Sequence, residues 1–173
     1  MYTNSFYNNR SFPIISVLQR KPQAAAEITG SKDYPQIKGT VKLYQTNYGV
    51  ILRAEIGGLP ETETACSRGI FAFHIHNGSE CSGDMNDQFS NAMSHYDPEK
   101  CLHPYHAGDL PPLFSNNGYA MSVFLNNSFS VNDVIGKTVI IHDKPDDFTT
   151  QPSGNSGTKI ACGVIRKTNT CCQ

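Results

Sequence analysis

The sequence predicts an all-β domain with about eight short strands, arranged as a sandwich or a Greek-key barrel. Short β-rich runs follow one another along the chain, and each ends at Gly, Pro or Asn. No stretch has the period of an amphipathic helix. The chain has 173 residues, of which 38% are hydrophobic and 10% are aromatic, so it is long enough for one domain with a single core.

Four strands are expected in the first half of the chain, after an extended or disordered arm over residues 1–23 that lacks clear periodicity. They lie in the runs AAAEITG, IKGTVKLYQTN, YGVILRAEIGGLP and FAFHIH. Asn47, Tyr48 and Gly49 predict a tight hairpin between the second and third runs. The Gly-Gly-Leu-Pro segment ends the third run, because these residues break regular structure.

A long loop is expected after the fourth strand, up to about Asn117, and loops of this length usually serve a function. Strand signals resume in YAMSVFLN, more weakly in FSVNDVIG, and then in KTVIIHD and TKIACGVIRK. A second irregular loop, over residues 143–157, separates the last two runs. We therefore divide the chain into a flexible arm (1–23), a β domain (24–167) and a cysteine-containing tail (168–173).

Charge and hydropathy exclude several classes of partner. The net charge of −1 and the pI of about 6.6 indicate neither a nucleic acid partner nor a membrane surface. No apolar run approaches the roughly 20 residues that a membrane span needs, and no signal peptide is recognisable. Six cysteines are more than a reduced cytosolic enzyme usually has, which favours an extracytoplasmic, cell-envelope or spore-associated location.

Histidines are concentrated between Phe71 and Leu110, where five of the six occur. His74 and His76 lie two residues apart, so a β-strand directs both imidazoles to one face and the intervening apolar side chains to the other. Two histidines on a rigid strand form a preorganised half of a metal site. A bare HxH is weak evidence on its own, because surface histidines are common.

A second cluster supplies three more imidazoles and a carboxylate within fifteen residues: His95, His103, His106 and Asp109. This set suits tetrahedral zinc without a thiolate ligand. The alternative is a polar loop with scattered histidines, which does not account for the HxH pair upstream. The sixth histidine, His142, follows a later apolar strand, so every histidine of the chain lies in a segment that is able to contribute to a metal centre.

The motifs HIHNGSEC, HYDP, HAGDLP and GNSGTKIACGVI, in this order, resemble the copper/zinc superoxide dismutase family, most closely its bacterial branch. The resemblance extends from about Ala24 to Ile165. It implies an eight-stranded Greek-key β-barrel with long metal-binding and electrostatic loops, related to the immunoglobulin-like sandwiches among which this family is itself counted. It also implies that copper redox cycling disproportionates superoxide anion to oxygen and hydrogen peroxide.

The resemblance assigns ligands to two metals, with His95 bridging between them. Copper is expected on His74, His76, His95 and His142. Zinc is expected on His95, His103, His106 and Asp109. Copper suits imidazole ligands and changes its oxidation state, whereas zinc has no redox chemistry and contributes structure and charge.

Two further residues, Asp146 and Lys159, occupy positions with defined roles in the family. Asp146 matches a carboxylate that accepts hydrogen bonds from one copper histidine and one zinc histidine, here His74 and His103, and so orients both rings. An alternative is that Asp146 is only a solvated loop acid in DKPDDF. His95 and Lys159 are the expected catalytic residues. His95 is expected to take up a proton, and Lys159 to attract the anionic substrate.

The cysteines have unequal roles under this resemblance. Cys81 and Cys162 are the expected disulfide, which ties the long loop to the last strand. Cys101 is either a competing zinc ligand or a buried or pairing thiol, since it lies two residues before His103. Cys66 has no expected role. Cys171 and Cys172 are expected either to form intermolecular disulfides or to end a free tail, and the family includes both monomers and homodimers.

Two departures from the family pattern affect the expected activity. Lys159 occupies the position of an arginine in GNSGTKIACGV, and lysine lacks the planar fork of donors, so we expect a reduced turnover. The interval between His103 and His106 is also shorter than in animal members. A noncatalytic metal-binding or structural envelope or spore-layer protein is the main alternative. A zinc hydrolase is disfavoured because four protein ligands leave no open position.

Overall fold

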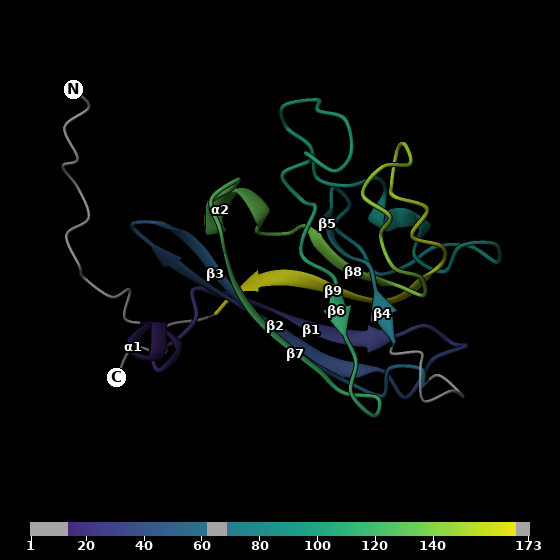
Figure 1. Cartoon of the computed structure of the whole chain (residues 1–173), viewed down its shortest axis with the longest axis horizontal. Helices are drawn as coiled ribbons and strands as arrows, with labels where there is room; N and C mark the ends of the chain where they lie inside the picture. The colour runs from purple at the N-terminus through teal and green to yellow at the C-terminus, as the bar shows by residue number, and fades with distance from the viewer. Residues whose placement is uncertain (1–13, 62–68, 169–173) are drawn as a thin grey trace, which may run out of the picture.

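The computed structural model describes residues 14–61 and 69–168, and these form a curled antiparallel sheet of seven strands (Figure 1). The strand order is β5-β8-β9-β1-β2-β3-β7. The bounds are β1 Ala24–Gly30, β2 Lys38–Thr46, β3 Gly49–Gly57, β5 Phe73–His76, β7 Ala120–Asn126, β8 Thr138–His142 and β9 Lys159–Lys167. A two-stranded sheet pairs β4, Ile70–Phe71, with β6, Leu113–Phe114. The predicted all-β class is confirmed.

The strands form because apolar residues alternate with polar ones along them. In β1, Ala26 and Ile28 are buried while Glu27 between them is exposed. In β3, Leu52 and Ile56 are fully buried in the same core. Burying one such side chain stabilises the fold by about 1.5–3 kcal/mol, so the inner face of the curled sheet supplies most of the driving force for folding.

The predicted hairpin between β2 and β3 is confirmed. Thr46 pairs with Gly49, and the Thr46 hydroxyl accepts a hydrogen bond from the Tyr48 N–H and donates one to the Gly49 carbonyl oxygen. Gly49 has a φ of +130°, which residues other than glycine rarely adopt. A Cβ at this position would also lie 2.4 Å from the carbonyl oxygen of Asn126, so the turn requires glycine.

Residues 129–136 contain a short helix, α2 (Val131–Val134), where the sequence weakly predicted a strand; that prediction is wrong. The Ser130 N–H and hydroxyl both donate to the Asp133 carboxylate, at 2.8 and 2.7 Å, and the N–H bond is the one that the N3 side chain makes in a capping box at the first turn. Both valines of the turn are buried, because one helical turn directs positions three apart to the same side.

A second short helix, α1 (Ile14–Leu18), lies within the segment expected to be an extended arm. Val17 is buried against Tyr44 and Ile51 on the outer face of the sheet, and this contact holds α1 in place. Residues 1–13, which the same prediction covers, lie outside the described residues, as does the tail beyond Thr168. Among the described residues, no helix is both long and apolar enough to cross a membrane.

The two long loops, residues 77–112 and 143–158, lie together at one end of the sheet, in teal and yellow-green in Figure 1. Gln151 joins them: its side chain accepts a hydrogen bond from the His103 N–H at 3.0 Å and donates one to the His103 carbonyl oxygen at 2.7 Å. The predicted disulfide between Cys81 and Cys162 is confirmed and ties the first loop to β9. A 3-10 turn, η1 (Ser90–Ala92), lies in this loop.

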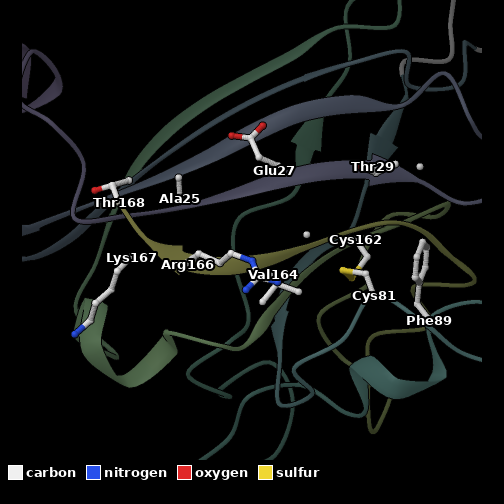
Figure 2. A pocket seen from close by; sticks show the side chains of 12 residues that line it. Ala25, Glu27, Thr29, Cys81, Phe89, Cys162, Val164, Arg166, Lys167 and Thr168 are labelled. Atoms are coloured by element: carbon white, nitrogen blue, oxygen red, sulfur yellow. A yellow bond between two sulfur atoms is a disulfide. The ribbon is translucent and has the colours of Figure 1, made fainter. Parts of the chain in front are cut away.

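Figure 2 shows the disulfide beside Phe89, at one end of a cavity of about 500 Å³ on the outer face of β1 and β9. Glu27 and Arg166 also line this cavity. None of its lining residues is a histidine. The cavity is therefore separate from the centre where the histidines meet.

Candidate metal centre

Strand β5 positions the first two histidines. His74 and His76 are buried on one face, while Phe73 and Ile75 point into the main hydrophobic core on the other. Only 0% and 2% of the two histidines is exposed. β5 pairs with β8, and every residue of both strands is buried, so the strand that carries the two imidazoles is firmly packed.

Two segments of the long loop lie against the open edge of β5 and bring further ligands to it. The Tyr96 N–H donates to the Ile75 carbonyl oxygen at 2.8 Å, and the Ile75 N–H donates to the Gly108 carbonyl oxygen at 2.9 Å. These backbone bonds place His95 opposite His76 and Asp109 opposite His74. The loop is thus ordered as an irregular extension of the sheet, which explains how residues distant in sequence meet.

His142 comes from β8, the other neighbour of β5. The pairing of β8 with β9 is irregular between Ile141 and His142, where the register shifts. His142 Nε2 lies 3.4 Å from His76 Nε2, so these two rings approach each other edge to edge across the strand pair. The His142 ring is 4% exposed, and the residue opposite it in β9 is Lys159.

All seven residues expected to bind metal are brought together in two groups. The first group contains His74, His76, His95 and His142; the second contains His95, His103, His106 and Asp109. Within each group the donor atoms lie within 4.8 Å of one another. His95 belongs to both groups, which is the arrangement that a bridging imidazole requires.

The hydrogen bonds of the rings leave the correct nitrogens available. His74 and His103 each use Nε2 to contact the Asp146 carboxylate, at 2.8 Å in both cases. Asp146 Oδ2 faces His74 and Oδ1 faces His103. The Nδ1 atoms of both rings are buried without a hydrogen-bond partner. Each is therefore free to act as a metal ligand, and Asp146 fixes which nitrogen carries the proton.

In His76 and His95 too, one ring nitrogen contacts an acceptor of the protein and the other is left for a ligand group. His76 Nδ1 donates to the carbonyl oxygen of Met93 at 2.7 Å, which turns Nε2 inward. His95 Nε2 is buried and unpartnered, while His95 Nδ1 lies 2.7 Å from Asp109 Oδ1. The two nitrogens of His95 thus face the two different groups.

The spacing of the second group fits a tetrahedral zinc ion. His103 Nδ1 and His106 Nδ1 each lie 3.1 Å from Asp109 Oδ2, and His106 Nδ1 lies 3.4 Å from His95 Nδ1. Ligands at zinc distances of about 2.0–2.1 Å lie about 3.3 Å apart in a tetrahedron. Four imidazole nitrogens in the first group suit copper. The residues present therefore fit copper and zinc.

Burial shifts the protonation of these groups in the direction that metal binding needs. Desolvation lowers the pKa of His74 and His76, and lowers the pKa of His142 to about 3. Burial alone would raise the pKa of Asp146, but hydrogen bonds from His74, the Phe148 N–H and His103 lower it to about 2. Near neutral pH the three rings are neutral and Asp146 is an anion.

Gly154 is a residue of the site that the sequence analysis did not identify. Its φ is +66°, and a Cβ there would lie 1.9 Å from Asp146 Oδ1 and 2.7 Å from His103 Nε2. The backbone of the second loop thus packs directly on the contact between carboxylate and imidazole. The GNSG segment signals a tight turn in the sequence, but it does not indicate what the turn approaches.

A cleft of about 500 Å³ opens over the histidines and includes Lys159. Lys159 Nζ lies 2.5 Å from Asp87 Oδ2 and 3.3 Å from the carbonyl oxygen of Phe89. Asp87, which the sequence analysis also missed, lines the same cleft. Cys101 is an exposed free thiol and belongs to neither ligand group. The remaining cysteines lie outside the described residues: Cys66, Cys171 and Cys172.

Comparisons with known proteins agree with this geometry. The family model described as copper/zinc superoxide dismutase (SODC) matches residues 37–165. Superoxide dismutase [Cu-Zn] 2 of Aquifex aeolicus is 32% identical over 83% of this chain and 86% of its own. Superoxide dismutase [Cu-Zn] of Legionella pneumophila is 35% identical over 80% of this chain and 82% of its own. The chain therefore belongs to the copper/zinc superoxide dismutase family.

Proposed function

We propose that this protein is a superoxide dismutase that disproportionates superoxide anion to oxygen and hydrogen peroxide. The observation that carries the proposal is the position of His95, whose two ring nitrogens face two separate groups of buried donor atoms. A protein that used the fold only as a scaffold would not need to keep a complete redox site. The names of its relatives, which are superoxide dismutases, support the same reaction.

Each metal has its own ligand set in this proposal. Copper would be held by His74, His76, His95 and His142. Zinc would be held by His95, His103, His106 and Asp109. Bound copper supplies the one-electron redox change that the reaction requires, and zinc supplies charge and structure. The bonds from Asp146 to His74 and His103 couple the orientation of one ring in each set.

The protein's own groups handle protons and the anion. His95 Nε2, which lacks a hydrogen-bond partner in the protein, accepts a proton and gives it up again, while Nδ1 keeps the ring in the second ligand group. Lys159 provides the cation of the cleft. A single ammonium presents no planar pair of donors, so we expect turnover below that of a member with arginine at this position.

A noncatalytic metal-binding protein of a cell envelope or spore layer is the second candidate. One observation favours it: the Lys159 ammonium is already paired with Asp87, so no side chain that lines the cleft offers an uncompensated positive charge to attract superoxide. The ligand groups are the same in both proposals. The two candidates therefore differ in activity and not in metal content.

Metal content and dismutation, measured on one preparation after dialysis against copper and zinc, distinguish these functions. The dismutase predicts about one ion of each metal per chain and activity that depends on copper. Binding of both metals with activity no higher than that of the buffer would favour the noncatalytic protein. Failure to bind either metal would overturn both.

A further inference from the structure

The cation of the cleft is held by an acidic side chain from the disulfide-linked loop. Asp87 Oδ2 contacts Lys159 Nζ at 2.5 Å across 72 residues of sequence. The side chain of Lys159 is 15% exposed and that of Asp87 is 37% exposed, so the carboxylate is the more exposed member of the pair. Both side chains line the same cleft, so an anion that enters it experiences both charges.

The Asp87 carboxylate is fixed in place by its own loop. Its Oδ1 atom accepts a hydrogen bond from the Phe89 N–H at 2.9 Å, and its own N–H donates to Asp84 Oδ1 at 3.1 Å. The Asp87 carbonyl oxygen accepts from the N–H groups of Asp84 and Ser90, both at 3.0 Å. Hydrogen bonds to residues before and after Asp87 therefore fix its backbone and one oxygen of its carboxylate. The other oxygen contacts Lys159.

Hydrogen bonds of Gln88 attach this loop to the connection between β1 and β2. The Gln88 side chain accepts a hydrogen bond from the Lys32 N–H at 2.8 Å and donates to Asp33 Oδ2 at 3.1 Å, in the loop between β1 and β2. The disulfide fixes the same loop at Cys81, and its partner Cys162 lies three residues after Lys159 in β9. The disulfide therefore links the loop that contains Asp87 to the strand that contains Lys159.

The charged side chains that line the cleft do not by themselves favour an anion. They are one ammonium, Lys159, and two carboxylates, Asp87 and Asp97. Asp97 Oδ2 lies 4.0 Å from His106 Nε2, on the side of the second ligand group. Asp87 is the carboxylate in direct contact with the cation, and a partly buried pair is screened less by salt than an exposed one.

We propose that Asp87 is a positioning residue that holds the Lys159 ammonium and lowers the affinity of the copper centre for anions. This inference rests on the proposed function, because it concerns how the same cleft admits its substrate. Asp87 sets the field that an incoming anion experiences, and it acts through Lys159. It therefore tunes the affinity for anions in a chain whose cation is lysine.

Azide titration of the copper- and zinc-loaded protein, followed by the visible absorption of copper, tests this role. Asp87→Asn removes the charge and keeps an oxygen to accept from the Phe89 N–H. We expect the Kd for azide to fall about threefold or more at low ionic strength, with a steeper dependence on salt than in the wild type. Asp87→Glu keeps the charge and should restore the wild-type affinity.

Two matched variants separate a local effect from a change in net charge. Glu27→Gln alters net charge equally, on the exposed face of β1 in the other cavity (Figure 2), and should leave azide affinity unchanged. Lys159→Met removes the partner, so adding Asp87→Asn to it should change azide affinity less than in the wild type. Thermal unfolding of each variant identifies any that fail to fold.

The outcomes distinguish this inference from the proposed function. Equal azide affinity in wild type and Asp87→Asn, with both dismuting superoxide, would overturn the role of Asp87 and leave the enzyme proposal intact. An equal gain in the presence and absence of Lys159 would show that Asp87 does not act through it. Tighter azide binding without dismutation in any variant would support the role of Asp87 and overturn the enzyme proposal.

Discussion

One carboxylate connects the two ligand groups at the scale of single residues. Asp146 contacts His74 through one oxygen and His103 through the other, and its side chain is 1% exposed. A carboxylate in this position determines the tautomer and the orientation of both rings. Gly154, in the same loop, lies so close to this carboxylate that a Cβ there would be 1.9 Å from Oδ1.

Replacing Asp146 with asparagine should weaken zinc before copper. The amide offers one acceptor in place of two, so one ring loses its partner; His103 serves only the zinc set, whereas the copper set has three other histidines. We expect a loss of zinc affinity of about 10- to 100-fold. Metal content after dialysis against a chelator measures it. Asp147→Asn, in the same loop but without a histidine contact, is the control; unchanged zinc content in Asp146→Asn would contradict the prediction.

Lys159→Arg should raise the rate of dismutation. A guanidinium can retain its bonds to Asp87 and Phe89 while it presents a further N–H to the cleft, which a single ammonium bound at both does not do as well. Kinetics of superoxide decay at matched copper content measure the effect. Lys38→Arg, at an exposed position of β2, is the control. If Lys159→Arg is no faster than the wild type, this cation does not limit the reaction.

The metal-free protein should lose stability as the pH falls below about 6.5, the pKa of an unfolded histidine. Burial lowers the folded pKa of His142 to about 3, so between these values the unfolded chain binds a proton that the folded chain does not. The free energy of unfolding then falls with decreasing pH, by up to about 1.4 kcal/mol per unit for this residue. Urea titrations from pH 8 to pH 4 measure it, and a flat profile would contradict the prediction.

Some residues of the site could be predicted from the sequence and others could not. The histidines could be predicted because several motifs, among them HIHNGSEC and HAGDLP, occur together and in the order of the family, although an HxH pair alone is weak evidence. Asp87 could not, since an acid in a polar loop normally faces solvent, and its contact with Lys159 spans 72 residues. The same holds for the Met93 carbonyl oxygen that orients His76, because a backbone acceptor has no signature in the side-chain pattern.

At the scale of elements, the alternation of apolar and polar residues predicted strands such as β1. The two short helices were not predicted. Strand β1 has the predicted bounds, because Ala26 and Ile28 alternate with polar positions. α2 was missed because β-branched residues favour strands, although the Ser130-to-Asp133 spacing of a capping box was present. α1 was missed because its stabilising contacts lie on the outer face of the sheet, which local sequence does not reveal.

Removing the disulfide should destabilise the protein and free the loop that carries Asp87. Cys81 and Cys162 are separated by 81 residues, and closing a loop of this length lowers the entropy of the unfolded chain by an amount worth about 4 kcal/mol. Urea unfolding of the Cys81→Ser and Cys162→Ser double variant, compared with Cys101→Ser, measures the difference. Cys101 is exposed and unpaired, so its replacement should have little effect. Equal midpoints for the two variants would contradict the prediction.

At the scale of the whole molecule, the centre joins parts that the hydrophobic core holds only indirectly. His74 and His76 come from β5 and His142 from β8, all within the packed sheet. The remaining ligands come from the long loop, whose attachments to the sheet include backbone bonds beside β5, the contact of Asp87 with Lys159 in β9, and the disulfide. Buried donor atoms without partners face both groups, so bound metal would satisfy them and add a link between loop and sheet.

Metal removal should therefore lower the melting temperature, and the two metals should contribute separately. Free metal at about 100 times its Kd stabilises a folded protein by about 2.7 kcal/mol, or roughly 5–10 °C for a chain of this size. Calorimetry of apoprotein, zinc-loaded and fully loaded protein measures each increment. His103→Ala removes one zinc ligand outside the copper set, so it should abolish the zinc increment and retain an increment with copper. If zinc raised the melting temperature of His103→Ala as much as that of the wild type, the second group would not be the zinc site.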